Sequence, residues 1–354
     1  MSDPIKYMPG FNNEFSSEAL EGALPEFGNN PQKCPYDLYA EQLSGTAFTA
    51  PRRENRRAWM YRIQPSVLHA PFVPAEGEGW RGHGAMSEAN GYEINPNQLR
   101  WAPLPLPGAG ATPPGRTFAR SLMTMGGHGD PCSKQGLAIH MYACDESMGE
   151  TAMMNSDGDF LIVPQVGELT VTTEMGVLEV PPRHIALVPR GIVFKVDVAE
   201  ASRGYVLELF KGHFELPDLG PIGSNGLANP RDFQAPTARF HDEPNSPWTL
   251  YNKFGGKLFQ TTRDGTPFNV VAWHGNYCPY RHSCMTPHGP DAPTFNAASN
   301  MELKPHKFDG GLAFMFETSC MLMLNKEALE AEHRDVNYFK CWEGIPRSFT
   351  GAKK

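Results

Sequence analysis

Two histidines, His282 and His288, stand six positions apart in a segment whose residue types suit metal binding. Pro287 and Pro290 exclude a helix there, so the sequence predicts that both imidazoles lie on a stiff loop. A non-haem iron site with two histidines and one carboxylate needs a further histidine and an acidic ligand. No H-x-H, H-x-D, H-x-E or H-E-x-x-H spacing next to the loop supplies them. The segment therefore predicts half of a metal-dependent active site.

A zinc site is the rival interpretation of this region. Three imidazoles and two thiols lie close together in the sequence, and zinc accepts both ligand types in a tetrahedral site. They are His274, Cys278, His282, Cys284 and His288. The spacing matches no common zinc finger, and His274 ends an apolar, strand-like run, where a histidine with a structural role is the commoner outcome. The sequence therefore favours a structural His274 over a zinc knuckle.

Composition limits the class of protein. A chain of 354 residues with 33 prolines and 35 glycines predicts many short strands joined by turns, with few long helices. The net charge of -8 argues against nucleic acid or an anionic membrane as a partner and favours small molecules or other proteins. Seven cysteines without a C-x-x-C pair suit reduced thiols. With no signal peptide and no apolar span, these features predict a soluble, cytoplasmic protein.

The clearest secondary-structure signal is a series of short β-strands between Asp159 and Phe210. Apolar runs and apolar–polar alternation there are separated by turn residues. The predicted strands are 160–163, 169–173, 185–188, 192–196 and 205–210. Further strands are predicted at 58–63, 268–273 and 311–324, and a short helix at 326–334. Residues 1 to about 60 are otherwise predicted to form an extended, irregular arm. Short strands at this spacing predict an antiparallel sandwich or barrel.

Part of this β region resembles the motifs of cupin jelly rolls. In the second cupin motif a histidine follows a Pro-x-Gly turn, and here Phe194 occupies that place after Pro189-Arg190-Gly191. His140 stands without the second histidine of the first motif. The sequence therefore predicts a mainly β, cupin-like sandwich whose N-terminal domain holds no metal.

Four long strings identify a family. Residues 7–13, 42–52, 269–277 and 285–291 closely resemble the homogentisate 1,2-dioxygenase family, and the resemblance covers nearly the whole chain. It implies an Fe(2+)-dependent, extradiol-type dioxygenase of tyrosine and phenylalanine catabolism. Such an enzyme opens the ring of homogentisate with O2 and gives maleylacetoacetate. The resemblance also implies two β domains and a homo-oligomer, the hexamer.

The resemblance also implies roles for the two histidines. His288 matches the histidine that binds both iron and substrate, and His282 matches a catalytic histidine beside the iron ligands. Between Arg281 and His282 the family carries a long segment with the other iron ligands, which this chain lacks. The predicted domains are therefore an arm plus metal-free sandwich (1–280) and a truncated remnant of the iron-binding domain (281–354). The alternatives are a catalytically inactive, truncated or spliced form that assembles with full-length subunits, and an incomplete gene model that does not exist as a stable protein.

Overall fold

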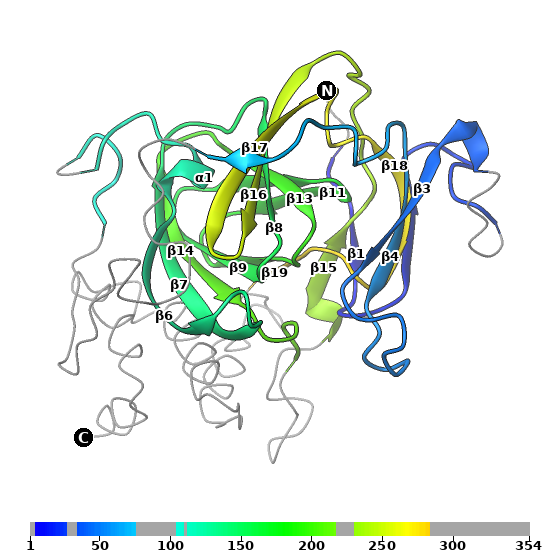
Figure 1. The fold of residues 1–354 in the computed structure, drawn as a ribbon, viewed down its shortest axis with the longest axis horizontal. Helices are drawn as coiled ribbons and strands as arrows, with labels where there is room; N and C mark the ends of the chain where they lie inside the picture. The colour runs from blue at the N-terminus through cyan, green and yellow to red at the C-terminus, as the bar shows by residue number, and fades with distance from the viewer. Residues whose placement is uncertain (1–3, 27–33, 76–103, 110–111, 217–229, 284–354) are drawn as a thin grey trace, which may run out of the picture.

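β-strands are the main secondary structure of the residues that the structure describes, and they lie in three largely antiparallel sheets (Figure 1). The structure is a computed structural model that describes residues 4–26, 34–75, 104–109, 112–216 and 230–283. Within these ranges the helical elements are short: α1 (Phe118–Ser121) and the 3-10 helices η1 (Pro35–Asp37) and η4 (Pro230–Asp232). No helix in these ranges has the length and apolar character needed to cross a membrane.

The largest sheet has eight strands. In spatial order they are β1 (Tyr7–Pro9), β15 (Phe233–Pro236), β19 (Tyr280–Ser283), β12 (His184–Val188), β9 (Asp159–Val166), β14 (Ser202–Leu209), β7 (Gln135–Cys144) and β6 (Met123–Asp130). All neighbouring strands in this sheet pair antiparallel.

A seven-stranded sheet faces it. Its spatial order is β11 (Gly176–Val180), β10 (Leu169–Thr173), β13 (Val193–Val198), β8 (Thr151–Asn155), β16 (Pro247–Phe254), β17 (Lys257–Asp264) and β5 (Val73–Pro74). Only β16 and β8 pair in parallel in this sheet, within the described residues. A four-stranded sheet lies to one side of the sandwich (Figure 1). It contains β2 (Phe15–Glu18), β18 (Val270–Gly275), β4 (Arg57–Arg62) and β3 (Tyr39–Ser44).

The eight consecutive strands β7 to β14 form a jelly roll. Their spatial order is β12-β9-β14-β7 in one sheet and β11-β10-β13-β8 in the other. Apart from the β10–β11 hairpin, consecutive strands thus alternate between the two sheets in the pattern of two Greek keys, the arrangement that jelly rolls and cupins share. The prediction of a mainly β, cupin-like sandwich is therefore confirmed.

The strands that the apolar pattern predicted are present. β9 contains the predicted run 160–163, which is buried throughout, so both faces of the sheet are covered at this strand. β10, β12, β13 and β14 correspond to the other four runs between 169 and 210, and β4 and β18 correspond to the predicted strands at 58–63 and 268–273. The predicted strand 311–324 and helix 326–334 lie outside the described residues.

The N-terminal segment differs from the predicted irregular arm. Its strands β1, β2 and β3 each pair with strands far away in sequence or with β4. Tyr7 lies opposite Pro236, and Phe15 lies opposite Gly275. Partners this distant supply the hydrogen bonds that the local sequence of these short segments does not signal. The segment is thus an integral part of two sheets.

Candidate functional site

The structure places only one of the two predicted site histidines. His288 lies outside the described residues, whereas His282 lies in β19, between β15 and β12 of the eight-stranded sheet. The prediction that His282 sits on a stiff loop is therefore wrong. The prolines restrict the chain only around themselves, and His282 pairs with Phe233 on one side and Ile185 on the other. At this position, backbone pairing with β15 and β12 determines the conformation of the chain.

The His282 imidazole has a defined hydrogen-bonding state. Its Nδ1 lies 3.3 Å from the carbonyl oxygen of Asp232, and its ring stacks on Phe233 with centroids 4.4 Å apart. A carbonyl oxygen only accepts, so Nδ1 carries the proton and Nε2 keeps a lone pair in the neutral ring. Burial lowers the pKa of His282, although Asp232 opposes this effect. The ring is therefore a neutral base with Nε2 as its basic atom.

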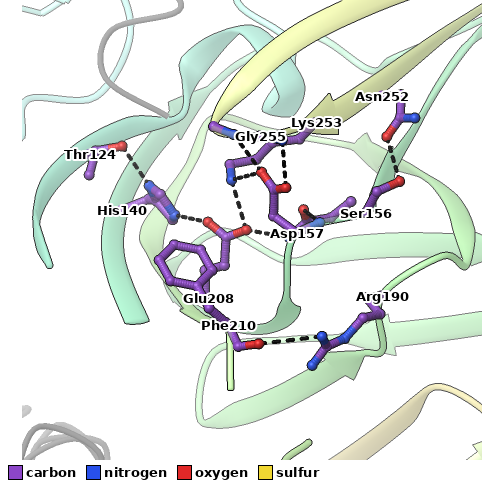
Figure 2. Close-up of polar contacts among 12 residues, drawn as sticks. Thr124, His140, Ser156, Asp157, Arg190, Glu208, Phe210, Asn252, Lys253 and Gly255 are labelled. Atoms are coloured by element: carbon purple, nitrogen blue, oxygen red, sulfur yellow. Dashed lines mark hydrogen bonds and ion pairs between the residues drawn. The ribbon is translucent and has the colours of Figure 1, made fainter. Parts of the chain in front are cut away.

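A buried polar cluster lies inside the jelly roll (Figure 2). Lys253 of β16 is fully buried, and its Nζ lies 2.7 Å from Asp157 Oδ2 and 2.9 Å from Glu208 Oε1. Glu208 belongs to β14, so this ammonium group connects the seven-stranded and eight-stranded sheets across the interior. The backbone amides of Gly255 and Gly256 donate to the two oxygens of Asp157 at 2.7 and 2.8 Å.

His140 extends the same network on the other side of Glu208. Its Nε2 lies 3.0 Å from Glu208 Oε2, and its Nδ1 lies 2.9 Å from Thr124 Oγ1. An ionised Glu208 only accepts, so Nε2 donates to it and Nδ1 accepts from the threonine hydroxyl. Burial is the main reason that the pKa of His140 is lowered. Both ring nitrogens are thus engaged in a neutral imidazole, and metal coordination by His140 requires breaking one of these bonds.

Phe194 fills the place where the second cupin motif carries a histidine. Its ring is fully buried and makes edge contacts with Phe118 and Phe160 at centroid distances of 6.3 and 6.4 Å. An apolar side chain therefore packs at this motif position. In the described ranges no three His, Cys, Asp or Glu side chains come together as a metal ligand set.

The pH dependence of stability follows from Glu208. Burial alone raises the pKa of its carboxyl, but Lys253 and His140 outweigh burial and lower the pKa to about 2. The folded-state pKa lies below the ordinary value of 4.5, so this stabilisation is present above pH 4.5 and is lost as the pH falls towards 2. The pKa of His140 is also lower in the folded state than its ordinary value of 6.5. Its protonation in the unfolded state therefore also reduces stability as the pH falls below 6.5.

We therefore expect urea unfolding to show a decrease on the order of 3 kcal/mol through Glu208 between neutral pH and pH 2. In Glu208→Gln the decrease below pH 4.5 should flatten, because the titrating group is gone. Glu168→Gln, at an exposed position, is the matched control and should keep the wild-type slope. Equal slopes for wild type and Glu208→Gln contradict the assignment.

A second buried cluster connects the four-stranded and seven-stranded sheets. Arg62 of β4 donates to Glu41 of β3 at 2.9 Å and to Glu174, in the turn between β10 and β11, at 2.7 Å. Its Nε donates to Asn269 at 3.2 Å. Arg62 and Glu174 are almost completely buried, so the ion pair is shielded from solvent. This cluster fixes the four-stranded sheet against the jelly roll.

His274 also has the structural role that the sequence favoured. Its Nε2 lies 3.0 Å from the Tyr61 hydroxyl, and the two rings stack with centroids 5.8 Å apart. Cys278 is buried nearby in sequence, and burial raises its pKa to about 12. A thiol with that pKa stays protonated at neutral pH, which does not favour zinc binding.

Apart from His140, sequence reasoning missed the residues of both buried clusters. A signal for Glu208 is present, because it interrupts the apolar run 205–210. Lys253 gives a weaker signal, since it is one charged residue in a strand that the sequence did not predict. Neither signal shows which carboxylates approach the ammonium, because Asp157 and Glu208 lie on other elements.

Taken together, the two facing sheets, the strand order and the buried network define a jelly-roll protein of the cupin class. Residues 6–284 match the family described as homogentisate 1,2-dioxygenase N-terminal, and residues 276–349 match homogentisate 1,2-dioxygenase C-terminal. The chain belongs to the homogentisate 1,2-dioxygenase family. Both matches include residues 276–284, the region that contains β19.

Individual relatives align with this chain over almost their full lengths. The Homo sapiens homogentisate 1,2-dioxygenase is 42% identical over 441 residues, covering 98% of this chain and 97% of the relative. The Dictyostelium discoideum homogentisate 1,2-dioxygenase is 40% identical over 429 residues, covering 96% and 97%. Both aligned lengths exceed the 354 residues of this chain, so the relatives contain residues without a counterpart here. Among solved structures, a cupin-2 domain protein from Shewanella frigidimarina aligns with a TM-score of 0.22 and 12% identity, covering 25% of this chain and 79% of that one.

Proposed function

We propose that this chain catalyses the reaction of its family, the extradiol-type cleavage of homogentisate by O2 to maleylacetoacetate with Fe(2+) as cofactor. The observation that carries the proposal is the identity of about 40% to relatives named for this activity, across nearly the whole of both chains. The proposed setting is the cytoplasm, and the proposed assembly is the family's homo-hexamer.

The proposed iron site belongs to the C-terminal part of the chain. The described body gathers no three-ligand set, and the motif positions of the jelly roll carry Phe194 and a fully engaged His140. These residues do not fit a ferrous centre. In this proposal His288 binds iron and contacts the substrate, as the family resemblance implies. When bound, iron supplies O2 activation and orientation of the aromatic substrate.

His282 is proposed as the catalytic histidine that acts on protons. Its neutral ring holds a proton at Nδ1 against the Asp232 carbonyl and has a lone pair at Nε2. The domain division at 280 and 281 is retained as a proposal, and β19 crosses it. Strand pairing therefore attaches the C-terminal part to the eight-stranded sheet.

The test is oxygen uptake by the Fe(2+)-reconstituted chain on homogentisate, with iron per subunit counted in the same sample. Uptake with stoichiometric iron supports the proposal and means that other residues of this chain complete the iron site around His288. In His288→Ala we expect both iron content and uptake to fall at least about tenfold, since loss of a ligand should cost no less than loss of its supporting contacts. His241→Ala, at an exposed position, is the control and should retain both.

His282→Asn separates the two proposed roles. It should keep its iron but lower the rate of uptake, because it removes the basic nitrogen without removing an iron ligand. No uptake and no retained iron in the wild-type chain contradicts the proposed function. That outcome leaves the inactive, truncated form that assembles with full-length subunits.

A further inference from the structure

His213 has a hydrogen-bond acceptor at each of its two ring nitrogens, at a place where three separate parts of the chain meet. Its Nδ1 lies 2.9 Å from Asp159 Oδ2, and its Nε2 lies 2.8 Å from the carbonyl oxygen of Gly45. Asp159 begins β9, and His213 follows β14. Gly45 directly follows β3 and opens the loop 45–56, which leads to β4. The imidazole therefore joins this loop to the jelly roll.

The two acceptors determine which hydrogens the ring carries in this arrangement. A carbonyl oxygen only accepts, and so does a carboxylate. The Asp159 carboxyl also accepts from the backbone amide of Arg190 at 3.0 Å and from Arg190 Nε at 3.4 Å, so it serves as an acceptor throughout. Both bonds of His213 therefore form together only in the imidazolium, which has a hydrogen on each nitrogen.

The charged and titratable groups that are seen to face the ring come from three other elements. Asp159 of β9 attracts the imidazolium, and its side chain is only 2% exposed. Arg190, in the turn between β12 and β13, shares this carboxylate with His213, so its positive charge opposes that of the ring. Tyr277, between β18 and β19, contacts the ring with centroids 5.2 Å apart. Burial raises the pKa of Tyr277 well above its ordinary value of 10, so this phenol stays neutral.

Loss of one proton from the ring affects its two hydrogen bonds differently. The remaining hydrogen stays on Nδ1, because a bond to the Asp159 carboxylate is stronger than a bond to a neutral carbonyl. The lone pair of Nε2 then faces the lone pairs of the Gly45 oxygen at 2.8 Å, which is a repulsive contact. The repulsion is relieved when the loop moves away from His213.

We propose that His213 is a pH-sensitive switch: the charged ring holds the loop 45–56 against the jelly roll, and the neutral ring releases it. The loop carries Phe48, which is 90% exposed, and Arg53, whose side chain is 84% exposed. Its movement therefore changes an apolar and basic part of the molecular surface. The switch goes beyond the proposed dioxygenase reaction, because it uses neither of the histidines proposed for that reaction.

Hydrogen exchange measured by mass spectrometry tests the switch between about pH 5.5 and about pH 8, with exchange times scaled for the intrinsic effect of pH. The reporters are two amides at the base of the loop. Gly45 donates to the Arg56 carbonyl at 2.8 Å, and Arg56 donates to Thr46 Oγ1 at 2.9 Å. We expect the protection of these amides to fall about fivefold as the pH rises, because one hydrogen bond that holds the loop is lost.

His213→Gln removes the titrating group and keeps an amide N–H that donates to one acceptor. The loop of this variant should show the same protection at both ends of the pH range. His241→Gln, at an exposed position, is the matched control and should keep the wild-type decrease. An equal decrease in His213→Gln overturns the proposal. A wild-type loop whose protection stays constant or rises with pH also overturns it.

The wild-type chain alone keeps the proposal testable if His213→Gln does not fold. The internal controls are the amides of Gly255 and Gly256, which donate to Asp157 and should keep their protection. The lowered pKa values of Glu208 and His140 make stability rise with pH, so this global effect is opposite in sign to the expected decrease. A decrease confined to the loop supports the switch. A parallel decrease at Gly255 and Gly256 overturns it.

Discussion

Replacing Lys253 with methionine is expected to lower the free energy of unfolding by about 3–5 kcal/mol. The ammonium group is the positive partner of both Asp157 and Glu208, at 2.7 and 2.9 Å, and none of the three side chains has appreciable exposure. Methionine fills a similar volume but leaves two carboxylates uncompensated in the interior. The resulting loss is much larger than the median contribution of a surface ion pair.

Urea unfolding at neutral pH measures this effect, and Lys257→Met is the matched control. Lys257 is exposed at the start of β17, so its replacement should change stability by no more than about 0.5 kcal/mol. The loss of unfolding free energy in the double variant Lys253→Met/Glu208→Gln should be smaller than the sum of the losses in the two single variants. The second substitution removes one of the carboxylates that Lys253→Met leaves uncompensated. Similar stabilities for Lys253→Met and Lys257→Met would show that the network does not stabilise the sandwich.

The second large effect is expected at Arg62. Arg62→Met should also lower the free energy of unfolding by about 3–5 kcal/mol, since it leaves Glu41 and Glu174 without their cation between two sheets. Arg62→Lys should recover only part of the loss. A single ammonium group cannot replace the planar guanidinium group, whose separate nitrogens reach both carboxylates and Asn269.

Chemical unfolding monitored by tryptophan fluorescence measures this loss. Trp273 lies in β18 of the four-stranded sheet and reports on its separation from the sandwich. Arg53→Met is the control, because the Arg53 side chain is 84% exposed and pairs only with its neighbour Glu54 in the described residues. Full wild-type stability in Arg62→Lys contradicts the role assigned to the guanidinium group of Arg62.

The parts of the fold that the sequence predicted are those whose pattern is local. β9 is a continuous apolar run, and β10 alternates between apolar and polar residues, so each shows its strand character within a few residues. β3, with the sequence Tyr-Ala-Glu-Gln-Leu-Ser, carries no such pattern. It is a strand because β4 supplies a paired neighbour, and that information lies outside the segment.

The candidate site was less predictable for the same physical reason. The conformation of His282 depends on Phe233 and Ile185, which flank it in space, and the prolines further along the chain do not determine it. Likewise, Glu208 and Lys253 are distant charged residues in the sequence, and only the facing of two sheets makes them an ion pair. The family resemblance implies the roles proposed for His282 and His288, but it does not indicate these contacts.

The pairing of the earliest strands with the latest ones has a consequence for biosynthesis. Tyr7 in β1 pairs with Pro236. β2 can pair only after β18 is synthesised, since Phe15 lies opposite Gly275. At a ribosomal rate of about 5–20 residues per second, the N-terminal strands remain without partners for roughly ten seconds or more. During this interval their edges can pair with other chains, so the nascent protein passes through a long period of vulnerability to aggregation. Exposure of β1 ends when β15 pairs with it, and exposure of β2 ends when β18 pairs with it.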